Sequence, residues 1–370
     1  MASKIILHIG LQKSGTTFLQ HMLYDNRDVL AEAGFCYPVS PNWGKGKRTV
    51  PNHEWSSYGL LGTEFPWVSK RRAANQAAAW QALVDQVATW PGTVLLSAEA
   101  LSVIRAPAIG RLLDALGCDD VDVLVTARSL GRSLPSLWQQ HVRNGKYSGF
   151  ESYLESLAEW RERGPDHIES DPDSHLWRAF VLSGLVRRWS EAGVNRVRAV
   201  TTPGRPPEVL WHRFVEALGL PRLAQVEPTQ EWHRAHSGLT APETLVLASL
   251  NRLLDENRWK RQDADRLRDA VTERFQTREE RGGKIVIPPE WRPTVAEWNQ
   301  EDLSALSGMG AEILGDIADL RYDPDGESGS APTAEEMGRA GAEALFAAVG
   351  LQPNEPPPKR KARAVRRILP

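Results

Sequence analysis

A lysine, a serine, a glycine and two threonines follow the first apolar run of the chain and could bind phosphate. The run is Ile5–Ile9, and the loop after it reads Gly-Leu-Gln-Lys-Ser-Gly-Thr-Thr from Gly10 to Thr17. If the run is a strand and a helix begins near Gly15, backbone N–H groups and the positive end of a helix dipole converge on one point. The two glycines allow a tight turn and a close approach of a ligand to the backbone. The segment therefore predicts an anion site.

The position of the lysine distinguishes this loop from the common nucleotide-triphosphatase signature. That signature reads GxxxxGK[ST], with its lysine directly after the second glycine. Here Lys13 precedes Gly15, and the chain contains no GK[ST] sequence. The order of residues therefore weighs against an ATP-binding loop of that kind.

A second candidate anion site follows the apolar run Val121–Thr126. Arg128 comes just after this run, and Ser136 lies eight residues further on, within a segment of helical spacing. A guanidinium group suits phosphate because its planar fork can bind two oxygens at once. The serine hydroxyl adds a donor without adding charge.

The string HIGLQKSGTTFLQ resembles the 5′-phosphosulfate-binding loop of sulfotransferases that use 3′-phosphoadenosine-5′-phosphosulfate (PAPS). In that family an arginine at a strand end and a serine eight residues later bind the 3′-phosphate, which matches the spacing of Arg128 and Ser136. Further stretches, TARSLGRSLPSLWQQHVRNG among them, look like a branch of the family common in actinobacteria. The resemblance covers residues 4–325 and leaves out the basic C-terminal tail.

The resemblance implies roles for individual residues. Lys13 is expected to contact the bridging oxygen between phosphate and sulfate. The implied donor-binding residues are Gly10, Gln12, Lys13, Ser14, Gly15, Thr16, Thr17, Arg128 and Ser136. Residues 278–291 loosely resemble the basic, glycine-rich segment that closes over the 3′-phosphate, which adds Arg281 and Lys284 as further candidates. A solvated run of charges is the other interpretation of that segment.

Sulfuryl transfer also needs a base, and the sequence offers two candidates. Negative charge builds on the leaving phosphate oxygen while the acceptor loses a proton, and Lys13 suits the first of these tasks. Glu99 follows the apolar run Thr93–Leu96, and some carbohydrate sulfotransferases use a glutamate where the cytosolic ones use a histidine. His53 is the rival, because the ordinary pKa of histidine is already near neutrality. The sequence leaves both residues open.

Short apolar strands between longer helical segments must position these residues. The predicted strands are Ile5–Ile9, 34–38, Thr93–Leu96, Val121–Thr126 and Arg196–Thr201. Strands that are apolar on both faces and alternate with helices are typical of an α/β fold with a central parallel sheet flanked by helices. Ligands of such sheets bind at the carboxyl ends of the strands. The resemblance adds that the architecture is that of a P-loop-like sulfotransferase.

The chain is predicted to have three parts. Residues 1–322 form the sulfotransferase domain, in which 40–70 are a long insertion and a candidate substrate loop. Within this domain, 161–175 are expected to be a polar loop and 240–276 to be helical. Residues 323–350 are expected to form a linker and a short Ala-rich helix. Residues 351–370 are a Pro-rich, basic tail, for which the composition predicts disorder.

Composition narrows the choice of partners and compartment. The 370 residues include 45 Lys and Arg and 47 Asp and Glu, a formal net charge of −2, which favours neither nucleic acid nor an anionic membrane. The two cysteines form no CxxC pair, and no apolar run is long enough for a signal peptide or a membrane helix. We therefore expect a cytoplasmic protein with a small-molecule partner, no nucleic-acid or membrane partner and no metal site. The oligomeric state is not predicted.

The sequence thus predicts a sulfotransferase that moves the sulfuryl group of PAPS to a hydroxyl of a small-molecule, natural-product or sugar acceptor by in-line displacement. Two alternatives stay open. One is an ATP-dependent P-loop kinase or triphosphatase, in which Glu99 would hold Mg²⁺. The other is a nucleotide-binding protein without catalytic activity.

Overall fold

The structure is a computed structural model that describes residues 2–39, 51–203, 206–226, 238–278, 281–327, 329 and 331–350. The chain divides into two compact units. Unit 1 comprises residues 1–140, 148–237 and 285–329, and unit 2 comprises 141–147, 238–284 and 330–370. Part of the expected substrate loop, 40–50, and the whole C-terminal tail, 351–370, lie outside the described residues.

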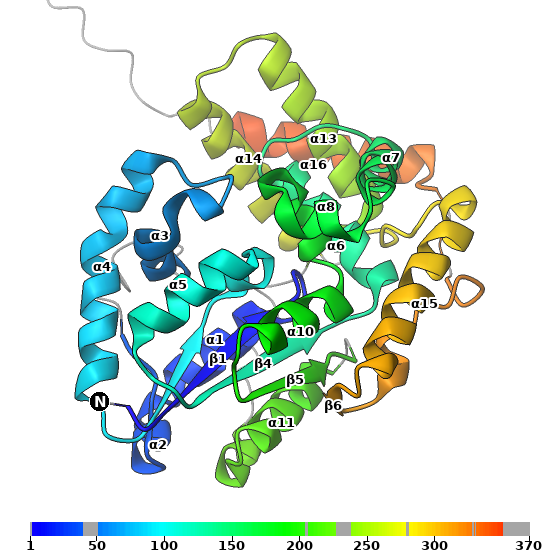
Figure 1. Ribbon diagram of the computed structural model, residues 1–370. Coiled ribbons are helices and arrows are strands. Elements are labelled where there is room, and N and C mark those ends of the chain that lie inside the picture. The colour runs from blue at the N-terminus through cyan, green and yellow to red at the C-terminus, as the bar shows by residue number, and fades with distance from the viewer. Residues whose placement is uncertain are drawn as a thin grey trace, which may run out of the picture. The chain divides into compact units, whose positions relative to one another are not determined.

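Unit 1 is built on a six-stranded sheet with the strand order β2-β3-β1-β4-β5-β6, in which every neighbouring pair is parallel (Figure 1). The strands are β1 Lys4–Gly10, β2 Phe35–Cys36, β3 Thr93–Ser97, β4 Val121–Ala127, β5 Arg196–Thr201 and β6 Glu312–Leu314. The predicted α/β class with a central parallel sheet flanked by helices is confirmed. The five predicted strands are present, and β6 is an addition that the sequence analysis missed.

Side chains along β1 alternate between the two faces of the sheet, as strand geometry requires. Ile5, Leu7 and Ile9 are buried with helices α3, α4, α5, α10 and α15, whereas Ile6 is buried with α1, α2 and α11. Each face therefore has its own apolar layer, which explains why the strands are apolar on both sides.

The helices of unit 1 connect successive strands and cover both faces of the sheet. Their bounds are α1 Thr16–Asp25, α2 Arg27–Glu32, α3 Glu54–Leu61, α4 Lys70–Thr89, α5 Ala106–Leu116, α6 Leu130–Arg143, α7 Phe150–Arg161, α8 Pro165–Ser170, α9 His175–Arg178, α10 Leu182–Glu191, α11 Pro207–Ala217 and α15 Arg292–Gly308. The last three residues of α6 are counted with unit 2. Short 3-10 helices also occur, of which η1 Gly62–Glu64, η2 Glu99–Val103 and η3 Pro172–Ser174 matter for the site.

Two segments are more regular than expected. The described part of the insertion, 51–70, contains α3 and η1. The stretch 161–175, expected to be a polar loop, is mostly the short helices α8 and η3. Its polar residues are explained by helix starts at prolines and by ion pairs rather than by an irregular backbone.

Unit 2 consists of α13 Ala241–Glu256, α14 Arg261–Gln276 and α16 Ala334–Gly350, which pack against one another. The helical prediction for 240–276 is confirmed, with a break between the two helices. Thr240 and Glu243 form a capping box at the start of α13. Arg281 pairs with the fully buried Glu243 at 2.7 Å, so the described contacts give this arginine a structural partner.

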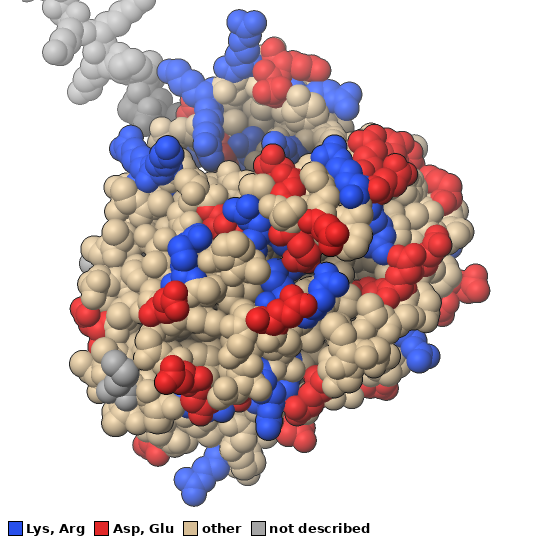
Figure 2. Space-filling model, in the orientation of Figure 1, with Lys and Arg blue, Asp and Glu red and all other residues tan. Residues whose placement is uncertain are grey.

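The described surface is mixed in charge. Figure 2 shows acidic and basic side chains interspersed over the face in view, in keeping with the net charge of −2. Among the described residues, no helix combines the length and the apolar content needed to cross a bilayer.

Candidate functional site

The loop between β1 and α1 turns sharply through two residues with left-handed backbone angles. Lys13 has φ 67° and Gly15 has φ 96°. The N–H of Leu11 donates to the carbonyl of Thr126 at 2.9 Å, which holds the start of the loop against the end of β4. A left-handed lysine is uncommon and costs free energy, so its persistence shows that the surrounding contacts determine this turn.

Ser14 is buried and stabilises the loop through hydrogen bonds. Its hydroxyl donates to the carbonyl of Leu11 at 2.6 Å and lies 2.8 Å from Thr126 Oγ1, and its own N–H also donates to Leu11. The hydroxyl of Thr202 donates to the carbonyl of Ser14 at 2.8 Å. Because Ser14 is fully buried and its donors are used within the protein, it shapes the loop.

Two glycines leave room that a side chain would fill. A Cβ at Gly10 would lie 2.2 Å from Thr16 Cγ2 and 2.5 Å from Thr126 Oγ1. A Cβ at Gly15 would lie 2.5 Å from Leu210 Cδ2, in addition to the strain of the positive φ. The loop can therefore close onto β4 and α11 only with glycine at both positions.

The start of α1 presents donors to the site. Gly15 is its N-cap, and Thr16 and Thr17 are its first two residues, where amide groups have no acceptor within the helix. Thr17 is half-buried and Gln12 is held through its N–H, which donates to Ala179 O at 3.3 Å. This end of the helix is suited to an anion such as phosphate.

Arg128 joins the second predicted motif to the first. Its Nη1 donates to the carbonyl of Lys13 at 3.0 Å and lies 3.5 Å from Ser136 Oγ. Its Nε is buried and has no hydrogen-bond partner among the described residues. Burial, with a smaller contribution from the like charge of Arg132, lowers the pKa of Arg128 to about 9. Arg128 and Ser136 are thus side by side, and a buried cation is available for an anionic ligand.

Glu99 lies beside the same loop, at the start of η2. The hydroxyl of Thr16 donates to Glu99 Oε2. Burial raises the pKa of Glu99, while the positive charge of Lys13 and the bond from Thr16 act to lower it. Lys13 Nζ also lies 3.5 Å from Gln140 Oε1 on α6. The structure therefore brings Lys13, Thr16 and Glu99 together at the carboxyl end of the sheet.

His53 has a different environment from the one expected of a base. It is 2% exposed, its Nδ1 accepts from the N–H of Ser97 at 2.9 Å, and its Nε2 donates to the carbonyl of Pro38 at 2.9 Å. Burial lowers the pKa of His53 to about 4, although the bond to the carbonyl of Pro38 acts in the opposite direction. Both ring nitrogens are thus engaged by the backbone, which gives His53 a structural role.

His8 is also part of the scaffold. Its ring bonds to the hydroxyls of Ser97 on β3, at 2.8 Å, and Thr126 on β4, at 3.4 Å. Burial lowers the pKa of His8 to about 3, so the ring is neutral. It ties together the three strands whose ends form the site.

Sequence reasoning missed Glu54, the first residue of α3. Its carboxylate accepts from the hydroxyl of Tyr58, and Trp67 Nε1 donates to the same hydroxyl at 3.0 Å. Burial, with a smaller contribution from the nearby charge of Glu99, raises the pKa of Glu54 to about 7. The one available signal was an acid at a helix start with a tyrosine four residues later, and this pattern is too common to identify a site.

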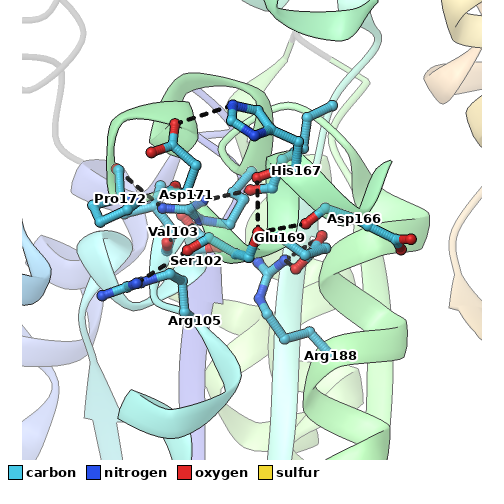
Figure 3. Close-up of polar contacts among 12 residues, drawn as sticks. Ser102, Val103, Arg105, Asp166, His167, Glu169, Asp171, Pro172 and Arg188 are labelled. Carbon is cyan, nitrogen blue, oxygen red and sulfur yellow. Dashed lines mark hydrogen bonds and ion pairs between the residues drawn. The ribbon is translucent and has the colours of Figure 1, made fainter. Parts of the chain in front are cut away.

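Two buried arginines hold the segment that follows Glu99. Arg178 is 1% exposed and donates to the carbonyls of four residues, Val103 at 2.7 Å, Ile168 at 2.5 Å, Asp171 at 2.7 Å and Pro172 at 3.3 Å. Figure 3 shows Arg188 between Glu169, at 2.6 Å, and the carbonyl of Ser102, at 2.8 Å. The two guanidinium groups therefore join η2 to α8 and η3 by donating to backbone carbonyls of these segments.

Comparison with protein-family models gives no match, and comparison with curated protein sequences gives none either. Among solved structures, the chain is similar to the crystal structure of a sulfotransferase from Alicyclobacillus acidocaldarius. The TM-score is 0.45 and the sequence identity 14%, over 84% of this chain and 96% of that one. No group of three or more His, Cys, Asp or Glu side chains that could hold a metal ion occurs among the described residues.

Proposed function

We propose that this protein is a sulfotransferase that moves the sulfuryl group of PAPS to a hydroxyl of a small-molecule acceptor. The observation that carries the proposal is the convergence of Lys13, Glu99 and Arg128 on the start of α1. Arg128 bonds to the carbonyl of Lys13, and Thr16 joins the loop to Glu99. These residues come from the ends of three adjacent strands, where ligands of parallel sheets bind.

The residues present fit a donor with two separate phosphate positions. The first-turn amides of α1 suit the 5′-phosphate, and the buried guanidinium of Arg128 beside the Ser136 hydroxyl suits the 3′-phosphate. The Nε of Arg128 supports this assignment, because it is buried without a hydrogen-bond partner among the described residues and can donate to a phosphate oxygen. PAPS would supply the activated sulfuryl group.

Lys13 and Glu99 have different roles in the proposed reaction. Lys13 stabilises the negative charge that develops on the phosphate oxygen as its bond to sulfur breaks. Glu99 accepts the proton of the acceptor hydroxyl as the new sulfur–oxygen bond forms. We assign the base to Glu99 and not to His53, because both ring nitrogens of His53 bond to the backbone.

One contact favours a second candidate function. A hydroxyl and a carboxylate in contact, as in Thr16 and Glu99, could instead hold Mg²⁺ in an ATP-using enzyme. The order of residues in the loop opposes this, since Lys13 precedes Gly15. A comparison of the binding of 3′,5′-ADP with that of ATP and Mg²⁺ therefore distinguishes the two candidate functions.

The test combines thermal shift with turnover. The wild-type protein is expected to be stabilised more by 3′,5′-ADP than by ATP with Mg²⁺, and to release 3′,5′-ADP from PAPS when a panel of alcohols is supplied. Lys13→Ala is expected to lower kcat about 10²- to 10³-fold, a typical loss for a charge-stabilising group. Because alanine keeps the same left-handed backbone strain, the fold should tolerate this change.

The exposed Lys70, at the start of α4, provides the matched control. Lys70→Ala should bind 3′,5′-ADP and turn over like the wild type. A larger shift with ATP and Mg²⁺ would favour the kinase alternative. Unchanged PAPS turnover in Lys13→Ala would remove the proposed role of the loop.

A further inference from the structure

A second arginine, Arg132 in the first turn of α6, is connected to the donor loop through the end of β5. Its Nη1 donates to the carbonyl of Pro203 at 2.9 Å and lies 3.3 Å from the carbonyl oxygen of Thr202. The hydroxyl of Thr202 donates in turn to the carbonyl of Ser14 at 2.8 Å. This path of hydrogen bonds joins α6 to the loop at a point next to Lys13.

Ser136 is a neighbour of both arginines. Arg128 Nη1 lies 3.5 Å from Ser136 Oγ and donates to the carbonyl of Lys13 at 3.0 Å. Arg132 and Ser136 are four residues apart on α6, so their side chains leave the helix on the same face. The two guanidinium groups therefore lie at one place, beside one hydroxyl and one loop.

The described partners of both guanidinium groups carry no charge. They are backbone carbonyls and the Ser136 hydroxyl, and Arg128 Nε is buried without a hydrogen-bond partner among the described residues. Burial lowers the pKa of both arginines, and the like charge of Arg132 contributes to lowering that of Arg128. Asp319 acts on Arg132 in the opposite direction, but its carboxylate is itself paired with Arg213 at 2.5 Å. Two partly buried positive charges of this kind favour the binding of an anion.

The basic segment 278–291, which the resemblance assigns to the 3′-phosphate, has its own contacts within unit 2. Arg281 donates to both carboxylate oxygens of the buried Glu243, at 3.0 and 2.7 Å, and to the carbonyl of Gly238 at 2.8 Å. Lys284, the other candidate of this segment, is exposed. Arg281 is thus part of a structural ion pair, whereas Arg132 has no such carboxylate partner among the described residues.

We infer that Arg132 is the second cation of the 3′-phosphate position, and that it makes the site selective for a donor that carries a phosphate monoester there. The inference rests on the proposed function for the identity of the donor, and on the contacts of Arg128 and Arg132 for its physical basis. A phosphate monoester carries about −1.5 to −2 charges at pH 7, which matches two guanidinium groups. A free 3′-hydroxyl would leave both positive charges without a counter-charge.

Calorimetric titration of wild type and variants with 3′,5′-ADP and with 5′-AMP tests the inference. Arg132→Gln should bind 3′,5′-ADP about 10- to 100-fold more weakly, because a charge-assisted contact is lost, and should bind 5′-AMP as the wild type does. Arg111, exposed on α5, provides the matched control, and Arg111→Gln should bind both nucleotides like the wild type. Equal losses for the two nucleotides in Arg132→Gln would give Arg132 a structural role only and would overturn the inference, as would the absence of any loss.

A second variant keeps the test open if Arg132→Gln does not fold. Arg132→Lys retains the positive charge and a donor for the carbonyl of Pro203, but its single nitrogen cannot also bind phosphate as a guanidinium does. It should therefore lose part of the preference for 3′,5′-ADP over 5′-AMP, and an unchanged preference would overturn the inference.

Lys284→Gln tests the rival segment. A loss of 3′,5′-ADP binding in this variant, with none in Arg132→Gln, would assign the second cation to residues 278–291 and overturn the inference while leaving the proposed function intact. Failure of the wild-type protein to bind 3′,5′-ADP would instead overturn the proposed function.

Discussion

Arg128 Nη1 donates a hydrogen bond of 3.0 Å to the carbonyl oxygen of Lys13, which joins two motifs that are 115 residues apart in the sequence. The carbonyl of Lys13 points to the arginine because the residue has a left-handed backbone, with φ 67°. The left-handed turn at Lys13 therefore also orients Arg128, because it directs the Lys13 carbonyl to the guanidinium group. The two parts of the proposed donor site are therefore joined by a direct hydrogen bond.

We expect nucleotide binding to require the planar, forked guanidinium group of Arg128 and not only its positive charge. A lysine at this position has one nitrogen, which cannot bond to the Lys13 carbonyl and bind a phosphate in the bidentate manner of guanidinium. Arg128→Lys is expected to weaken 3′,5′-ADP binding about 10- to 100-fold, corresponding to roughly 1.5–3 kcal/mol for a charge-assisted bond. Calorimetric titration with 3′,5′-ADP and with 5′-AMP checks this. An equal loss for both nucleotides would place Arg128 away from the 3′-phosphate.

Gly15 can be separated into its backbone strain and its close packing by a matched pair of variants. Gly15 and Gly193 both have positive φ, 96° and 85°, but only the Cβ of Gly15 would meet a side chain, at 2.5 Å. Gly193→Ala is expected to cost about 1–2 kcal/mol from left-handed strain alone. Gly15→Ala should cost more in urea unfolding and should also lose 3′,5′-ADP binding. Equal losses of stability would mean that Leu210 moves aside freely.

His8 and His53 should make the fold sensitive to acid. Burial lowers the pKa of His8 to about 3 and that of His53 to about 4, whereas unfolded histidine titrates near 6.5. The unfolded state therefore binds more protons below pH 6.5, and each ring should reduce stability by about 2 kcal/mol between pH 7 and pH 5. Unfolding of His8→Gln and His53→Gln at the two pH values should show a flatter dependence than the wild type. His212→Gln, at an exposed position, should leave the dependence unchanged.

Arg178 is expected to contribute to stability far more than a surface arginine. Arg178→Ala would remove the guanidinium that bonds to four backbone carbonyls, of which that of Asp171 keeps the N–H of Ser174, and we expect a loss of about 3–5 kcal/mol. Arg196 is 57% exposed in its side chain and 3.9 Å from Glu312, so Arg196→Ala should change stability by less than about 0.5 kcal/mol. Urea unfolding of both variants checks the contrast. Similar losses would show that the carbonyls find other donors.

The strands that form the centre of the sheet could be predicted from the sequence alone. β1, β3 and β4 are runs of mostly β-branched and aliphatic residues that are buried on both sides, and β5 is buried in its second half, Ala199–Thr201, so this pattern is local and strong. β6 is only three residues long, Glu312–Leu314, and pairs through its backbone with β5. No side-chain pattern predicts such a strand, because its pairing depends on where α15 ends.

The site was predictable where it follows strand ends and not where distant backbone segments meet. Glu99 is two residues beyond the end of β3 and Arg128 directly follows β4, so chain order alone placed them near the loop. Glu54 escaped prediction because its neighbour Glu99 is brought close by the bonds between His53 and Ser97, which are 44 residues apart. Ser14 was assigned from its motif position, and only the structure shows that its hydroxyl turns inward.

Because Lys13 has a left-handed backbone, selection for stability and selection for activity should favour different residues at this position. Glycine would adopt φ 67° without penalty, whereas lysine there costs about 1–2 kcal/mol of folding free energy. In a library selected only for survival after heating, Lys13→Gly should accumulate. In a library selected for sulfated product, lysine should persist. The residue found at position 13 after selection would therefore show whether the variants had been selected for stability or for activity.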